Sequence, residues 1–208
     1  MAKFPEPPPL HVLAGIAVDP YVIATGTLLW RVYPHAGRHP RAWNACRSFG
    51  PVKTMRFDHH SDPAREQERR ILYGASSIAI CVAEFFQEDK TIDRFMVEPW
   101  LVGFTVKRDV TLLNLCGAWP TRAGASMEIN SGQHGRARRW SRVIYDAYPN
   151  VEGLWYSSSM YKNEPAFAFY ERVEPALELT TFYHEPLSHR GLLTPLNGVA
   201  RELSWGLL

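Results

Sequence analysis

The sequence predicts a single α+β domain with a mixed or antiparallel sheet and few helices. Short apolar segments rich in β-branched and aromatic residues recur between Gly, Pro and polar turns, as strands do. Few segments have the apolar spacing of a helix. The chain shows no internal repeat, coiled coil or clear linker, and its 208 residues can bury one sizeable core.

The chain begins with a Pro-rich segment. Residues 1–20 predict an extended arm, followed by one domain over residues 21–208. Residues 35–51, rich in Gly, Pro and Arg, predict an irregular loop, and the charged residues 65–70 predict a short connecting helix. The predicted strands are residues 26–33, 71–74, 100–106, 110–115, 153–159, 166–170 and 177–183.

Three connecting segments complete this prediction. Residues 107–109 predict a turn that joins the two strands on either side of it. Residues 120–135 are rich in Gly and Ser and predict a mobile loop. The tail, residues 184–208, is polar and then weakly apolar, and it shows no clear element.

The most informative helix covers residues 77–86, where a single carboxylate, Glu84, interrupts an apolar run. Ser76 or Ser77 can cap this helix, because a serine oxygen accepts a backbone N–H of the first turn. At about 100° per residue, Ser77, Glu84 and Glu88 share one stripe, which predicts a stripe facing a polar cleft or open solvent. A solvated helix face is one interpretation, and a carboxylate placed for acid/base or cation-stabilising chemistry is the other.

The second helix covers residues 136–148 and begins with a dense basic run, Arg136 to Arg142. This pattern is typical of a solvated helix face with Trp140 and Ile144 packed inward. A nucleic-acid-binding surface is the alternative. The net charge of the chain is only +2, which is too small to favour nucleic acid by itself.

Composition and motifs exclude several classes of protein. Three widely spaced cysteines show no zinc spacing and predict thiols in a reducing, cytoplasmic compartment. No apolar stretch approaches the ~18 residues of a membrane span, so no membrane partner is expected. Neither a Walker A nor a GxGxxG motif is present, and no GxSxG elbow supports a hydrolase triad.

Other polar residues leave alternatives open. Arg31 ends an apolar strand, where its planar fork could bind phosphate or carboxylate, or where it could simply point outward. His59 and His60 suggest a metal, but adjacent histidines point in different directions and no second cluster exists, so no metal site is predicted. The serines at 157–159 could present a hydroxyl to a site or form a turn.

Taken together and in order, three separated segments resemble the RES domain, a bacterial family named for Arg, Glu and Ser. They are Trp30-Arg31-Val32-Tyr33, the run from Arg56-Phe57-Asp58 through Leu72-Tyr73-Gly74-Ala75-Ser76 to Ala83-Glu84, and Gly153-Leu154-Trp155-Tyr156-Ser157-Ser158. Order and spacing fit over about residues 26–172. Two features depart from the family pattern: Thr54-Met55-Arg56-Phe57-Asp58 replaces Gly-Gly-Arg-Trp-Asn, and Ser157 replaces a proline.

The resemblance implies an ADP-ribosyltransferase-like fold over residues 21–208 and an enzyme that consumes NAD+ as substrate. Members of the family break the nicotinamide–ribose bond by hydrolysis or phosphorolysis, or transfer ADP-ribose to a protein. Many are toxins neutralised by a separately encoded antitoxin. The expected function is therefore an NAD+ glycohydrolase or phosphorylase acting as such a toxin. A mono-ADP-ribosyltransferase and a non-enzymatic nucleic-acid-binding module are the alternatives.

The same resemblance implies roles for particular residues. A carboxylate can stabilise an oxocarbenium-like ribose, which suits Glu84, and an arginine fork can hold the diphosphate, which suits Arg31. Ser158 is the serine that the family register favours for orienting the ribose, and completes the expected catalytic set. The residues expected to bind NAD+ beside these are Tyr33, Arg56, Tyr73 and Ser157.

Overall fold

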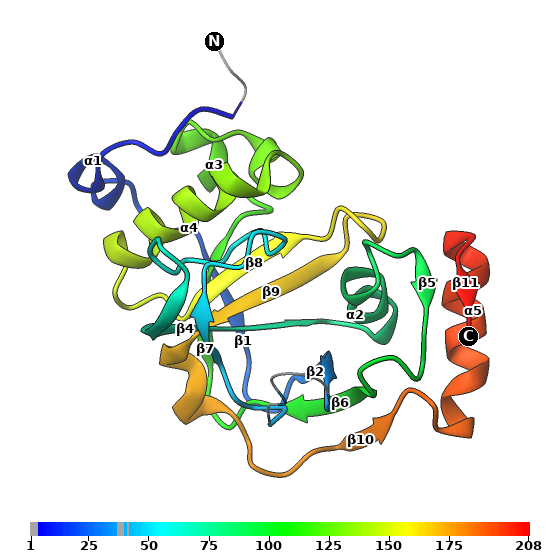
Figure 1. The fold of residues 1–208 in the computed structure, drawn as a ribbon. Coiled ribbons are helices and arrows are strands. Elements are labelled where there is room, and N and C mark those ends of the chain that lie inside the picture. Colours follow the sequence, from blue (N-terminus) through cyan, green and yellow to red (C-terminus); the bar gives the residue numbers. More distant parts are fainter. Residues whose placement is uncertain (1–3, 37–39, 41) are drawn as a thin grey trace.

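The computed structural model describes residues 4–36, 40 and 42–208, and its centre is a large curled sheet (Figure 1). The strands of this sheet follow the order β1-β7-β8-β9-β4-β2-β6-β10, and β3 pairs with β4. Among the described strands of this sheet, β7 and β8 are the one parallel pair, so the sheet is mixed, as predicted. The strands are β1 (Pro20–Ile23), β2 (Leu28–Pro34), β3 (Arg47–Gly50), β4 (Arg65–Ala75), β6 (Pro99–Thr105), β7 (Val110–Asn114), β8 (Gly153–Ser157), β9 (Pro165–Tyr170) and β10 (Tyr183–Pro186).

Helices flank the sheet on several sides, and a small parallel sheet pairs β5 (Thr91–Ile92) with β11 (Gly206–Leu207). In Figure 1, α1, α3 and α4 gather at one end, α5 lies at the other, and α2 lies between them. None of the described helices has the length and apolar character needed to cross a bilayer. They are α1 (Leu10–Ala14), α2 (Ile78–Phe85), α3 (Trp119–Arg122), η1 (Met127–Asn130), α4 (His134–Ala147), η2 (Glu171–Ala176), η3 (Arg190–Leu192) and α5 (Leu193–Leu203).

Apolar side chains are buried on both faces of the curled sheet. One face of the central strands packs against α2 and α4 in a cluster that includes Ile80, Trp140 and Tyr156. On the other face, side chains from distant strands meet, for example Phe104 of β6 with the cluster that contains Trp155 of β8. Because strands far apart in the order share one cluster, the sheet must curl. The predicted α+β class with few helices is confirmed.

The helix predicted over residues 77–86 is present as α2, capped by Ser77, whose Oγ accepts the Ile80 N–H at 3.4 Å. Its apolar character follows from contacts on two sides, since Ile80 and Cys81 join the cluster of the central strands and Val82 joins a cluster with α5. A helix that is packed on two sides leaves only a narrow stripe for polar residues.

Several sequence predictions about local structure were wrong. Residues 65–70 are not a helix but the first half of β4, because pairing with β3 and the later β9 pairing extend the strand and override local helix propensity. The loop predicted at 35–51 contains β3. Strands 100–106 and 110–115 form no hairpin, since β6 pairs with β2 and β10 while β7 pairs with β1 and β8.

The C-terminal part also differs from the prediction. The strand expected at 177–183 is irregular as far as residue 182, and β10 begins only at Tyr183. The tail contains α5, whose apolar residues pack on α2, a tertiary contact that weak local periodicity did not reveal. The segment predicted as a mobile loop, residues 120–135, contains α3 and η1.

The N-terminal Pro-rich segment, expected to be an extended arm, contains α1 and packs against α4. Phe4 is buried and stacks on Trp140, and the indole N–H of Trp140 donates to the carbonyl of Pro5 at 2.9 Å. Glu6 forms an ion pair with Arg139. The division into an arm at 1–20 and a domain at 21–208 stays a prediction.

Candidate active site

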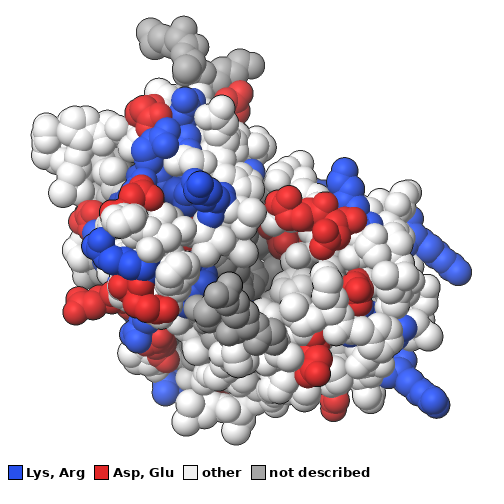
Figure 2. Space-filling view, in the orientation of Figure 1, with Lys and Arg blue, Asp and Glu red and all other residues white. Residues whose placement is uncertain are grey.

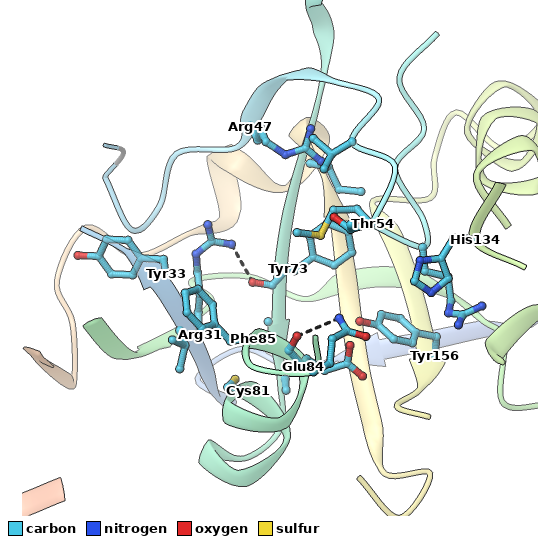
Figure 3. Close-up of a pocket in the computed structure, with 18 of the residues that line it drawn as sticks. Arg31, Tyr33, Arg47, Thr54, Tyr73, Cys81, Glu84, Phe85, His134 and Tyr156 are labelled. Carbon is cyan, nitrogen blue, oxygen red and sulfur yellow. Dashed lines mark hydrogen bonds between the residues drawn. The ribbon is translucent and has the colours of Figure 1, made fainter. Parts of the chain in front are cut away.

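A cavity of about 480 Å³ opens where α2 meets the ends of β2, β4 and β8. In Figure 3, Arg31 and Tyr33 lie on one side of it and His134 and Tyr156 on the other, with Tyr73 and Glu84 between them. Most of the cavity surface is apolar, as in small-molecule sites generally, and polar side chains are distributed around it. The residues on its wall with side chains able to bind a polar ligand are Arg31, Tyr33, Arg47, Thr54, Arg56, Tyr73, Glu84, Gln87, Asn130, His134, Tyr156 and Ser159.

Glu84 lines this cavity and is contacted by Ser158, which does not line it. The fully buried Ser158 hydroxyl donates to Glu84 Oε1 at 2.5 Å. The same Oγ accepts the backbone N–H groups of Met160 and Tyr161, both at 3.2 Å. Ser158 is therefore held by the turn that follows β8, and its hydroxyl has one orientation, toward the carboxylate. Two segments 74 residues apart in the chain thus form one polar pair.

The environment of Glu84 determines its proton affinity. Burial raises the pKa of Glu84 above its ordinary value, while the Ser158 hydrogen bond and the positive charge of Arg56 lower it. The net shift is upward. Burial lowers the pKa of Arg56, and the charge of Glu84 opposes that effect. Arg56 also lines the cavity and donates to the carbonyl of Gly132, which fixes its guanidinium.

The arginines at the other side of the cavity are oriented by backbone and carboxylate groups. Arg31 Nη1 donates to the carbonyl of Tyr73 at 2.8 Å, which joins β2 to β4 across their shared edge. Arg47 forms an ion pair with the buried Asp58 at 2.7 Å. Both guanidinium groups line the cavity, so this side carries positive charge suited to a phosphate or carboxylate.

Asp58 organises the segment that carries Arg56. Burial raises the pKa of Asp58. Hydrogen bonds from His60 and the Val52 N–H and the charge of Arg47 lower it by more, so the net pKa lies well below the ordinary value. Asp58 is therefore an ionised, fully buried carboxylate with several donors. It holds the chain between Val52 and Arg56 against β3.

The aromatic residues predicted to bind NAD+ lie on the wall in different ways. Tyr33 lines the cavity with its ring, and its hydroxyl forms a 2.7 Å hydrogen bond with His184 Nε2. Tyr73 lies at the centre, and burial raises its pKa well above the usual value. Tyr156 was not among the residues predicted from the sequence; its ring packs on Phe57 with centroids 4.8 Å apart.

The serines differ in position. Ser157 ends β8 and its Oγ lies 3.4 Å from the Sγ of Cys116, and it is not part of the cavity wall. Ser159 lines the cavity although Ser157 does not, because β8 ends at Ser157 and the alternation of a strand does not continue into the turn. The turn places Ser158 on Glu84. Ser157, which was expected to bind NAD+, contacts Cys116 and does not line the cavity.

The two adjacent histidines, His59 and His60, which suggested a metal in the sequence, pack against or pair with other side chains. His60 pairs with Asp58, and His59 packs between Tyr145 and Tyr170 with ring centroids 4.5 and 4.6 Å away. Burial lowers the pKa of His59 to about 4. Within the part of the chain that the structure describes, no group of three or more His, Cys, Asp or Glu residues could hold a metal ion.

The basic run of α4 is largely compensated. Arg136 and Arg139 pair with Glu6, and Arg142 pairs with Asp62 at 2.7 Å. On the face shown in Figure 2, blue and red residues alternate over this end of the molecule rather than forming one basic surface. This distribution is typical of a solvated helix face.

Fold and cavity together define an α+β sheet protein with a cavity that carries a carboxylate and several arginines on its wall. A comparison with models of known protein families matches residues 28–188 to the RES domain, most of the chain. The protein therefore belongs to the RES domain family, an NAD-related domain, and the resemblance stated from the sequence is confirmed. Searches of curated proteins and of solved structures gave no match.

Sequence reasoning missed several residues of the cavity. Arg47, Asn130 and His134 come from segments predicted to be loops, where no periodicity indicates which side chains point inward. Tyr156 belongs to one of the family-like segments, but no role was predicted for it. The alternation of β8 could have found it, since Tyr156 and Leu154 both join the cluster of the central strands while Trp155 joins the opposite cluster.

Replacing Glu84 by Gln should increase the free energy of unfolding at about pH 8, measured by urea denaturation. The folded-state pKa of Glu84 is raised, so its ionised form destabilises the fold at pH values above that pKa. As pH falls below the pKa of Glu84 in the unfolded state, the carboxyl is protonated in both the folded and the unfolded protein. The stability gained with Gln should then vanish. Glu88→Gln, an exposed carboxylate close by, should show no such gain. Destabilisation of Glu84→Gln at high pH would contradict the desolvation of Glu84.

Proposed function

We propose that this protein cleaves the nicotinamide–ribose bond of NAD+, with water or phosphate as acceptor. The observation that carries the proposal is the Glu84 carboxylate, oriented by Ser158 on the wall of a cavity that also presents Arg31 and Arg56. The RES family supplies the NAD-related context. A cavity of about 480 Å³ lies within the usual range for small-molecule sites.

The proposed chemistry matches the charges of the site. When the glycosidic bond breaks, its electron pair leaves with the pyridine nitrogen, so nicotinamide departs neutral and positive charge develops on the ribose. Glu84, between the two sides of the cavity, would stabilise that charge. The acceptor oxygen then bonds to the ribose carbon and loses a proton to solvent. Water yields ADP-ribose, and phosphate yields the 1-phosphorylated product.

The other residues would bind and position the substrate. Arg31 is suited to the diphosphate, and Arg56, near Glu84, to a ribose or phosphate oxygen. Ser158 would act through Glu84, because its hydroxyl donates to the carboxylate. Tyr33 would contact the substrate mainly through its ring, since its hydroxyl already binds His184. Tyr73, at the centre of the cavity, would also contact the substrate.

The same bond cleavage is compatible with transfer of ADP-ribose to a protein, so a mono-ADP-ribosyltransferase remains the second candidate. It is favoured by the same cavity and distinguished only by the acceptor. We further propose a toxin role with a separately encoded antitoxin, and a cytoplasmic location, where thiols such as those of Cys46, Cys81 and Cys116 stay reduced.

Incubation of the purified protein with NAD+, with and without phosphate, followed by mass spectrometry of the products, tests this proposal. Free ADP-ribose indicates hydrolysis, a phosphorylated ADP-ribose indicates phosphorolysis, and a mass increase on protein indicates transfer. Wild-type protein that leaves NAD+ intact under all these conditions would contradict the proposal.

Glu84→Gln should lower NAD+ turnover on the order of 10²–10⁴-fold, because the amide keeps the shape of the side chain but not the charge that opposes the ribose cation. Binding of NAD+, measured by calorimetry, should change much less. Glu88→Gln serves as the control and should turn over NAD+ normally. Near-normal turnover by folded Glu84→Gln would remove Glu84 from the reaction.

Ser158→Ala should lower kcat roughly 10-fold or more, the effect of losing one positioning hydrogen bond of about 1–2 kcal/mol. Ser157→Ala is the matched control. Its hydroxyl contacts Cys116 instead of the cavity, so it should cost much less. A larger loss in Ser157→Ala than in Ser158→Ala, in steady-state kinetics with NAD+, would contradict the assigned register.

A further inference from the structure

Asn130 is a buried polar residue on the cavity wall. The sequence did not indicate a role for it, and the proposed reaction does not involve it. It ends η1, between α3 and α4, and it is only 5% exposed. Asn130 lines the same cavity as His134 and Tyr156, which lie opposite Arg31 in Figure 3.

One hydrogen bond fixes the orientation of the Asn130 amide. Nδ2 donates to the carbonyl oxygen of Leu115 at 2.9 Å. A backbone carbonyl can only accept, so the amide cannot be turned to exchange its nitrogen and oxygen without losing this bond. Oδ1 must therefore be the other end of the amide, held as an acceptor.

That acceptor has no partner. Oδ1 of Asn130 is buried, and no residue among those that the structure describes donates a hydrogen bond to it. A buried acceptor without a donor is unfavourable, and it is rare in stable interiors. Asn130 lies on a cavity wall, so a small shift of its side chain would let a ligand in the cavity supply the missing donor.

The neighbours of Asn130 connect it to the reacting end of the site. Arg56 donates to the carbonyl of Gly132, two residues further along the chain. The same arginine lies close enough to Glu84 to shift its pKa, and Tyr156 is near both. In the proposed reaction, the leaving group lies beside this part of the wall when the ribose is at Glu84, and the Tyr156 ring could face a cationic pyridinium there.

We propose that Asn130 Oδ1 accepts a hydrogen bond from the carboxamide NH₂ of nicotinamide and makes the site selective for the amide over the acid. This inference rests on the proposed cleavage of NAD+. The carboxylate of the deamidated dinucleotide offers only acceptors, so its oxygens would repel Oδ1 and leave it unsatisfied. Sites that use a buried polar group in this way reject the analogue that lacks the matching donor.

The test compares kcat/KM for NAD+ and for nicotinic acid adenine dinucleotide. The wild-type protein should prefer NAD+ at least about 10-fold, and Asn130→Ala should bring the ratio of the two values close to one. A purely structural role would lower both values together and leave the ratio unchanged.

Asn197→Ala is the matched control. The Nδ2 of Asn197 also donates to a backbone carbonyl, that of Leu193 at 2.9 Å, but both residues lie in α5. Its ratio should equal the wild-type ratio.

A binding measurement keeps the inference testable if Asn130→Ala fails to fold. In the wild-type protein, calorimetry should show nicotinamide binding at least about 10-fold more tightly than nicotinic acid. Equal cleavage of the two dinucleotides by the wild type would overturn the inference and leave the proposed function standing. If the protein cleaved neither dinucleotide, the proposed function would be overturned. The role of Asn130 would still be supported if the wild type bound nicotinamide selectively and Asn130→Ala did not.

Discussion

The site depends on one constraint, the placement of an ionisable carboxylate at the edge of an apolar helix. Glu84 lies on α2, most of which is buried against the central strands and α5. Burial disfavours the charge, and the Ser158 hydroxyl and Arg56 partly offset that cost. Each partner comes from a different segment, so the turn after β8 and the segment before β4 must both be positioned by the fold.

Those segments are positioned by hydrogen bonds to buried side chains. Ser158 is held by two backbone N–H groups of its own turn, which leaves its hydroxyl hydrogen for Glu84. The buried Asp58 collects donors from Arg47, His60 and the backbone of Val52, and so fixes the segment that leads to Arg56. The His-Asp pair that suggested a metal in the sequence is thus part of the support for the cavity.

Sequence predicted the parts of this structure that local pattern determines. α2, its Ser77 cap, the strand that carries Arg31 and the strand that leads into Ser158 are present, because apolar periodicity and capping act over a few residues. The ordered motifs also placed Arg31, Arg56, Tyr73 and Glu84 on one cavity. Pattern could not predict long-range pairing, which turned residues 65–70 into β4 and separated β6 from β7. Nor could it identify Asn130, which reaches the wall from a connecting segment.

The ionisation of Glu84 is the most direct test of this account. Carboxyl carbon NMR of protein labelled at glutamate would follow it, with the Glu84 signal assigned by its absence from Glu84→Gln. We predict a titration midpoint above the ordinary value of 4.5 in the wild type, and a higher midpoint still in Ser158→Ala, which lacks the bond that favours the charged form. A wild-type midpoint at or below 4.5, or no change in Ser158→Ala, would contradict the account.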